Sequence, residues 1–194
     1  MSINWKYARP IKEKLTTLEE PGKPLLFDAD RGLVDDMAAS CSVKALVESL
    51  KGKGEIEAEQ ALKDFGRKLM KLTIELADGK YMDRTGEMIE KVASITGISF
   101  PHRFERYIEL SVLGSRPTDR WNIARATNRE FVFQVSSCSV AKALAEAGLK
   151  VPCKTMCLAS FETAAAKTGD RLKMEMTKAL PRDGICEFNF TLQP

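Results

Sequence analysis

The sequence predicts an α+β protein in which an N-terminal helical part packs on a C-terminal four-stranded antiparallel sheet. Two observations lead to this prediction. Through much of the first 116 residues, apolar side chains recur every three or four positions, as in amphipathic helices. After Pro117 the pattern changes to short segments of alternating apolar and polar residues with helical segments between them, which is typical of hairpins packed on helices.

The 194 residues are expected to form a single domain over residues 1–194, because this length suits one hydrophobic core. Its 44% apolar and 29% charged residues are ordinary for a globular protein. Within it we expect an N-terminal arm over residues 1–30, a helical part over 31–116 and a sheet-containing part with a cysteine site over 117–194.

The helical part contains four segments with helical spacing of apolar residues. They cover residues 33–50, 58–76, 85–94 and 104–112. The second segment is the clearest, because its apolar side chains form one stripe and its charged side chains lie mostly on the other faces. The arm has room for one further helix around residues 11–20.

Four strands are expected in the sheet-containing part, at residues 121–126, 130–136, 171–180 and 185–192. Between the second and third strands, two helices are expected, one capped by Ser136 or Ser137 and one that begins at Pro152. The order strand–strand–helix–helix–strand–strand predicts two hairpins in one antiparallel sheet, with the helices on one side.

Composition narrows the classes of function. The net charge of +3 and the mixing of basic with acidic residues disfavour nucleic acid, and no segment resembles a signal peptide or a membrane span. We therefore expect a cytoplasmic protein whose five cysteines are thiols or ligands, whose partner is a small molecule, and which forms a homodimer on base rates alone. The single histidine, His102, leaves catalysis mainly to carboxylates, thiols, hydroxyls or a cofactor.

Four of the five cysteines fall in the last third of the chain. Cys138 ends a strand or starts a helix, Cys153 and Cys157 are one helical turn apart, and Cys186 starts the last strand. Three separate elements therefore bring thiols toward one predicted pocket. Cys41 is different, because it lies on the apolar stripe of an N-terminal helix and is expected in the core.

Three interpretations of the cysteines stay open on residue type and spacing. They are small core residues, ligands of a zinc ion or an iron–sulfur cluster, or nucleophilic or ligand-gripping thiols. The metal interpretation lacks the paired C-x-x-C spacing. The thiol interpretation depends on the predicted helix starts at Cys138 and Cys153, where a helix dipole favours a thiolate.

Residues 131–190 resemble the L-2-amino-thiazoline-4-carboxylic acid hydrolase family. The similar pieces are, in order, Phe131-Val-Phe-Gln-Val-Ser-Ser-Cys138, Ala143-Leu-Ala-Glu-Ala-Gly148-Leu, Met156-Cys157, and the stretch from Thr177 to Gly184 with Cys186-Glu187-Phe188-Asn189-Phe190. Similar endings occur in 4-vinyl-reductase-type ligand-binding domains. The chain departs from the hydrolase pattern at Ser160, where the family has an acid, and at Glu187, where it has Asp.

The resemblance implies a hydrolase that opens the C–N bond of a small, sulfur-containing cyclic amidine. It implies catalytic roles for Cys138, Cys157 and Cys186, and it implies substrate contacts for the three residues Ser160, Thr177 and Glu187. No cofactor is expected on this hypothesis, and zinc or iron–sulfur belongs to the metal interpretation alone. The alternative hypothesis is a non-catalytic sensor or carrier that uses the same cysteine-lined pocket for a small molecule or metal.

Overall fold

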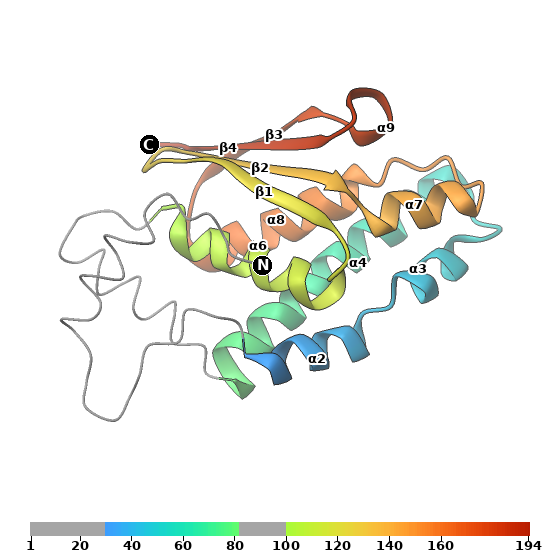
Figure 1. The fold of residues 1–194 in the computed structure, drawn as a ribbon, viewed down its shortest axis with the longest axis horizontal. Coiled ribbons are helices and arrows are strands. Elements are labelled where there is room, and N and C mark those ends of the chain that lie inside the picture. Colours follow the sequence, from blue (N-terminus) through green and yellow to red (C-terminus); the bar gives the residue numbers. More distant parts are fainter. Residues whose placement is uncertain (1–29, 82–99) are drawn as a thin grey trace.

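A four-stranded antiparallel sheet covers a layer of helices in the computed structural model, which describes residues 30–81 and 100–194 (Figure 1). The helices are α2 (Arg31–Ser40), α3 (Val43–Leu50), α4 (Glu55–Glu75), the π-helix η1 (Leu76–Lys80), α6 (His102–Ser115), α7 (Ser139–Glu146), α8 (Lys154–Thr168) and α9 (Leu180–Asp183). The strands are β1 (Arg120–Ala126), β2 (Glu130–Ser137), β3 (Leu172–Lys178) and β4 (Cys186–Leu192). The predicted fold class is confirmed.

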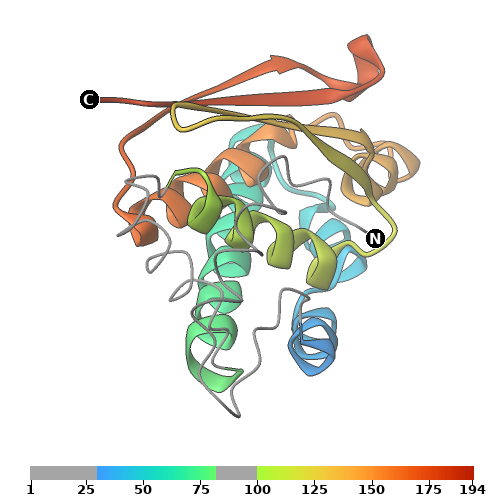
Figure 2. The ribbon, with the colours of Figure 1, turned by 60° about the vertical axis from the view of Figure 1, so that its left-hand side comes forward.

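The sheet has the strand order β1-β2-β4-β3, and every neighbouring pair is antiparallel. The two predicted hairpins therefore meet through their second strands, β2 and β4. Helices α2 to α8 lie on one face of the sheet (Figure 2). The inward residues of β2 and β4 are aromatic, and Phe131 pairs with Phe190 while Phe133 pairs with Phe188.

An aromatic cluster joins the sheet to the helices. Phe161 of α8 has its ring centroid 5.0 Å from that of Phe188 and 5.1 Å from that of Phe190, both at steep interplanar angles. Phe104 of α6 meets Phe190 in the same way at 5.0 Å. Edge-to-face pairs of this kind stabilise by about 0.5–1.5 kcal/mol beyond the area they bury, so this cluster anchors α6 and α8 under β2 and β4.

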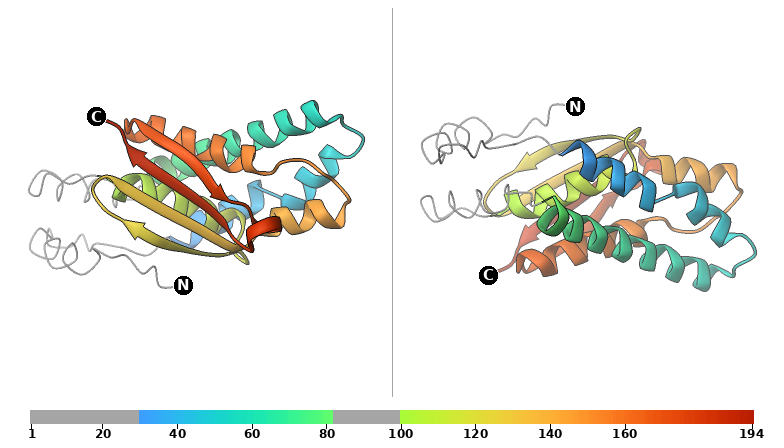
Figure 3. Two further views of the ribbon diagram at one scale, coloured as in Figure 1. Left: turned by 90° about the horizontal axis from the view of Figure 1, so that it is seen from above. Right: turned by 90° about the horizontal axis from the view of Figure 1, so that it is seen from below.

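Helices α4 and α8 run side by side beneath the sheet (Figure 3). Their close approach depends on Gly66, because a Cβ atom there would overlap the carbonyl oxygen of Met156. Met156 precedes Cys157 in α8, so this contact also helps to place the cysteine.

The structure differs from the sequence prediction in three places. The helix expected over residues 33–50 is two helices, because Cys41 and Ser42 are extended and the Ser42 hydroxyl accepts a hydrogen bond from Ala45 N at 3.1 Å to cap α3. The helix expected to be capped by Ser136 or Ser137 is α7, and its N-cap is Cys138. The turn expected between the last two strands contains the short helix α9.

Two predicted helices, around residues 11–20 and over 85–94, lie outside the described residues, as does nearly all of the expected arm over residues 1–30. Among the helices that are described, none is both long and apolar enough to cross a bilayer.

Candidate ligand-binding pocket

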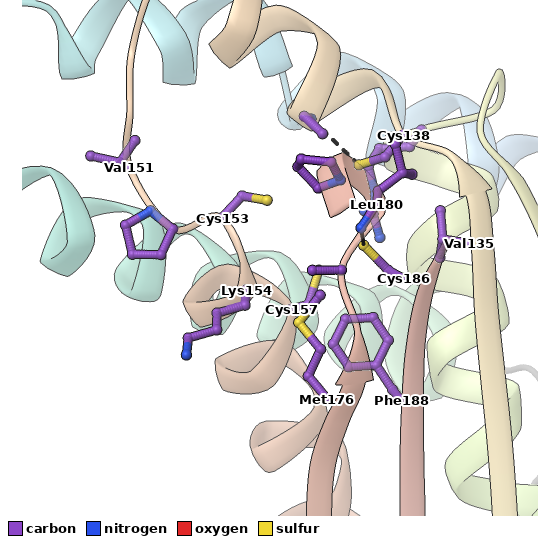
Figure 4. Close-up of a pocket in the computed structure, with 15 residues that line it drawn as sticks. Val135, Cys138, Val151, Cys153, Lys154, Cys157, Met176, Leu180, Cys186 and Phe188 are labelled. Atoms are coloured by element: carbon purple, nitrogen blue, oxygen red, sulfur yellow. Dashed lines mark hydrogen bonds between the residues drawn. The ribbon is translucent and has the colours of Figure 1, made fainter. Parts of the chain in front are cut away.

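A cavity of about 200 Å³ lies where one end of the sheet meets the N-terminal ends of α7 and α8 (Figure 4). Its described lining is apolar apart from four thiols and two cations, and consists of Arg116, Val135, Cys138, Ala141, Val151, Pro152, Cys153, Lys154, Cys157, Met176, Ala179, Leu180, Pro181, Cys186 and Phe188. No carboxylate of a described residue lines it.

Local hydrogen bonds fix two of the thiols. Cys138 is the N-cap of α7, and its sulfur accepts a hydrogen bond from Ala141 N at 3.5 Å. Cys186 pairs with Val135 across β4 and β2, and its sulfur accepts from Leu180 N at 3.4 Å, at the start of α9. Sulfur is a weak hydrogen-bond acceptor, and each bond holds its side chain in place.

The other two thiols belong to the start of α8. Cys153 is the N-cap of this helix and Cys157 lies one turn further along, so both side chains reach the cavity (Figure 4). The structure therefore brings together Cys138, Cys153, Cys157 and Cys186, from three separate parts of the chain. Cys41 is buried elsewhere, in the core beside α2.

The thiols are in an environment that favours their protonated form. Burial raises the pKa of Cys157 to about 12 and that of Cys153 to about 11, and burial also raises the pKa of Cys186. At Cys153, burial outweighs the helix N-terminus that the sequence suggested as a source of thiolate. These three side chains are neutral at physiological pH, and a neutral thiol is a poor nucleophile.

The cavity is also lined by a buried arginine that the sequence did not single out. Arg116 is the C-cap of α6 and is 6% exposed, and its Nη1 lies 3.6 Å from Oδ2 of Asp119. Asp119 is 1% exposed, and its Oδ1 accepts a hydrogen bond from Ser139 N at 2.7 Å, in the first turn of α7. Arg116 differs from most of the other described arginines by its burial, and no local sequence pattern shows that burial.

The remaining predicted residues do not line the cavity. Ser160 is buried within α8. Thr177 and Glu187 bond to one another, with Oγ1 of Thr177 donating to Oε1 of Glu187 at 2.8 Å. Glu187 also accepts from Gln134 and Lys178, so it belongs to a polar cluster on the sheet and not to the pocket. The roles assigned to these residues stay predictions.

His102 starts α6 and is 3% exposed, and it is not one of the residues that line the cavity. Within residues 30–81 and 100–194, no group of three or more His, Cys, Asp or Glu side chains is placed to hold a metal ion. The four cysteines therefore line a common space without forming a metal cage.

No family model and no curated protein matches the chain. Solved structures that are similar include an H-NOX protein from S. oneidensis in the Fe(II)NO ligation state, at 12% identity and a TM-score of 0.40, which covers 97% of this chain and 92% of that one. An oxygen-binding H-NOX domain related to soluble guanylate cyclases has 14% identity and a TM-score of 0.38, covering 95% and 85%. A structure from work on heme distortion in the H-NOX family has 12% identity and a TM-score of 0.40, covering 95% and 85%. These values are too low to transfer a function.

The resemblance to the amino-thiazoline hydrolase family is wrong, and so is the hydrolase function that it implied. No family model supports it, and the similar solved structures are H-NOX proteins. The pocket agrees, because three of its thiols are held protonated and no described carboxylate is present to activate water. The expectation of no cofactor stands against these solved structures, whose own descriptions name heme and an Fe(II)NO ligation state.

Proposed function

We propose that this chain is a non-catalytic ligand-binding domain, a sensor or carrier that holds a small, largely apolar molecule in the cysteine-lined cavity. The supporting observation is the cavity itself, which has a volume of about 200 Å³ and is lined mainly by aliphatic, aromatic and thiol groups. Apolar walls favour an apolar molecule over water, because water finds few polar partners beside them.

The size of the cavity limits the ligand. Pockets for drug-sized molecules have volumes of about 300–1,000 Å³, and this cavity is smaller. A heme is a macrocycle much larger than this volume, and Cys153, Cys157 and Cys186 are held as neutral thiols, whereas heme iron is ligated by a thiolate. The proposed ligand is therefore a single small ring or a short branched chain.

The test titrates the full chain separately with toluene and with indole. Calorimetry measures the binding, and the rise in melting temperature is a second measurement. Saturable binding is expected, together with a rise in melting temperature that grows with ligand concentration. Ala141→Leu should abolish binding by filling the cavity, whereas Ala145→Leu, at an exposed position of the same helix, should leave it unchanged.

Failure of both probes to bind would overturn the proposal. So would a stoichiometric complex with hemin that Ala141→Leu abolishes, because the cavity would then take a ligand much larger than its described volume.

A further inference from the structure

The charged side chains that line the cavity are both cations. Arg116 and Lys154 line it, and so do Cys138 and Cys153, the N-caps of α7 and α8. The N-terminal end of a helix carries partial positive charge and unsatisfied N–H groups. No described carboxylate lines the cavity, and the acid beside Arg116 is the buried Asp119.

Arg116 has hydrogen-bonding capacity to spare. Its Nε has no hydrogen-bond partner among the described residues, although the side chain is only 6% exposed. The 3.6 Å between Nη1 and Oδ2 of Asp119 is longer than the roughly 2.7–2.9 Å of a charge-assisted hydrogen bond. A further partner of the guanidinium is the sulfur of Cys138, which is a weak acceptor.

A buried guanidinium with an open donor is costly unless another acceptor completes its bonding. The planar fork of arginine donors matches a carboxylate, which accepts two parallel hydrogen bonds. Asp119 does not fill this role, because its Oδ1 accepts from Ser139 N and its Oδ2 has no hydrogen-bond partner among the described residues. The missing acceptor can therefore come from a molecule in the cavity.

We infer that the ligand is a small apolar monocarboxylate whose carboxylate is held by the buried Arg116. This rests on the proposed function and specifies its ligand class. The apolar body of the molecule lies against the side chains of Val135, Met176 and Phe188, and Arg116 decides that the anion is preferred over a neutral molecule of the same shape.

The first test compares benzoate with benzamide on the unaltered full chain, by calorimetry at neutral pH. The two molecules have nearly the same shape and differ in charge. Benzoate is expected to bind at least about tenfold more tightly, as a hydrogen bond to a charged group requires. Benzamide binding as tightly as benzoate would overturn the assignment, and a failure of both probes to bind would overturn it as well.

The second test removes the guanidinium while keeping the buried charges balanced. Arg116→Met alone strands the Asp119 carboxylate in the interior, so the variant is Arg116→Met with Asp119→Asn, and the matched control is Asp119→Asn alone. The double variant should lose the preference for benzoate and retain toluene binding within about twofold. The control keeps the guanidinium but removes its carboxylate, so its fold is checked first by circular dichroism, and the folded control should bind benzoate at least as tightly as the unaltered chain.

The outcomes separate the two proposals. Toluene that binds without any preference for benzoate would leave the ligand-binding function standing and refute the role of Arg116. A double variant that still prefers benzoate would refute it independently. Absence of binding by toluene, indole and benzoate alike would refute the function and, with it, the inference.

Discussion

The contact between α4 and α8 gives a direct test of how the pocket is built. Gly66 lies in the middle of α4, and a Cβ atom there would overlap the carbonyl oxygen of Met156. The same Cβ atom would lie 2.9 Å from the carbonyl carbon and 3.1 Å from the Cα of Met156. All three of these atoms belong to the backbone. They cannot rotate aside as a side chain does, so Gly66→Ala must separate the two helices by about 1 Å to restore ordinary contact.

Two effects of opposite sign decide how much Gly66→Ala changes the free energy of unfolding. Alanine is favoured over glycine in the middle of a helix by about 1 kcal/mol. Overpacking of a well-packed core costs about 1–3 kcal/mol, and a clash with rigid backbone belongs at the upper end of that range. The net loss in the free energy of unfolding is therefore about 2 kcal/mol, which corresponds to a fall of roughly 4–8 °C in melting temperature for a chain of this length.

Urea denaturation monitored by circular dichroism measures the change, with calorimetric melting as a second measurement. Gly79→Ala is the matched control, because a Cβ atom at this helical position in η1 meets nothing within 4 Å. The control should leave stability unchanged or raise it by up to about 1 kcal/mol. A Gly66→Ala protein as stable as the Gly79→Ala protein would refute the close approach of α4 to α8.

Three further predictions follow from the same structure. Burial raises the pKa of Cys153 and Cys157 above the ordinary value of 9.0, so the folded chain binds more protons than the unfolded chain between about pH 9 and 12. Urea titrations should therefore show the free energy of unfolding falling as the pH rises through that window. The fall should be less steep when Cys153 and Cys157 are both replaced by alanine. Phe161→Ala should lower the free energy of unfolding by about 3–5 kcal/mol in the same assay, because the ring contacts three other phenylalanines. Hydrogen bonds from Gln134, Thr177 and Lys178 lower the pKa of Glu187, so its contribution to the free energy of unfolding is present above pH 4.5 and is lost as the pH falls. Glu187→Gln should therefore weaken the loss of stability in acid. An unchanged loss of stability in acid would contradict the network.

Much of the fold could be predicted from the sequence because its signals are local. Strand β2 shows a period of two, and α4 shows one apolar stripe, so both elements were predicted close to their observed bounds. The convergence of Cys138, Cys157 and Cys186 could also be predicted. All three lie at or near the ends of elements that a sheet of two hairpins brings together at one end.

The parts that could not be predicted depend on burial and on long-range packing. A serine that caps α3 divides an apolar stripe that is nearly continuous in sequence, and the helical period alone does not show this break. Arg116 follows a helix and precedes a proline, which is ordinary for an exposed residue, and only the packing of α6 under the sheet buries it. The dipole expected to activate Cys153 is likewise a local effect that burial outweighs.

The misleading resemblance has a structural explanation in β4. Cys186, Phe188 and Phe190 all point into the core because strand residues alternate between faces, and each pairs with an apolar residue of β2. A Cys-x-Phe-x-Phe ending therefore suits the inward-facing side of a central strand in such a sheet. The motif reports how the strand packs, and it carries no catalytic chemistry of its own.

The position of the cavity suits a sensor better than a simple store. Two groups of buried residues make up the described core, one under the sheet and one among α3, α4, α7 and α8. Cys138 and Cys157 pack against both groups and also line the cavity. A molecule in the cavity therefore contacts the junction between the two groups and favours the arrangement in which they fit together around it. A ligand shifts a conformational equilibrium only through such a difference in contacts, so a sensor of the proposed kind would act at this junction.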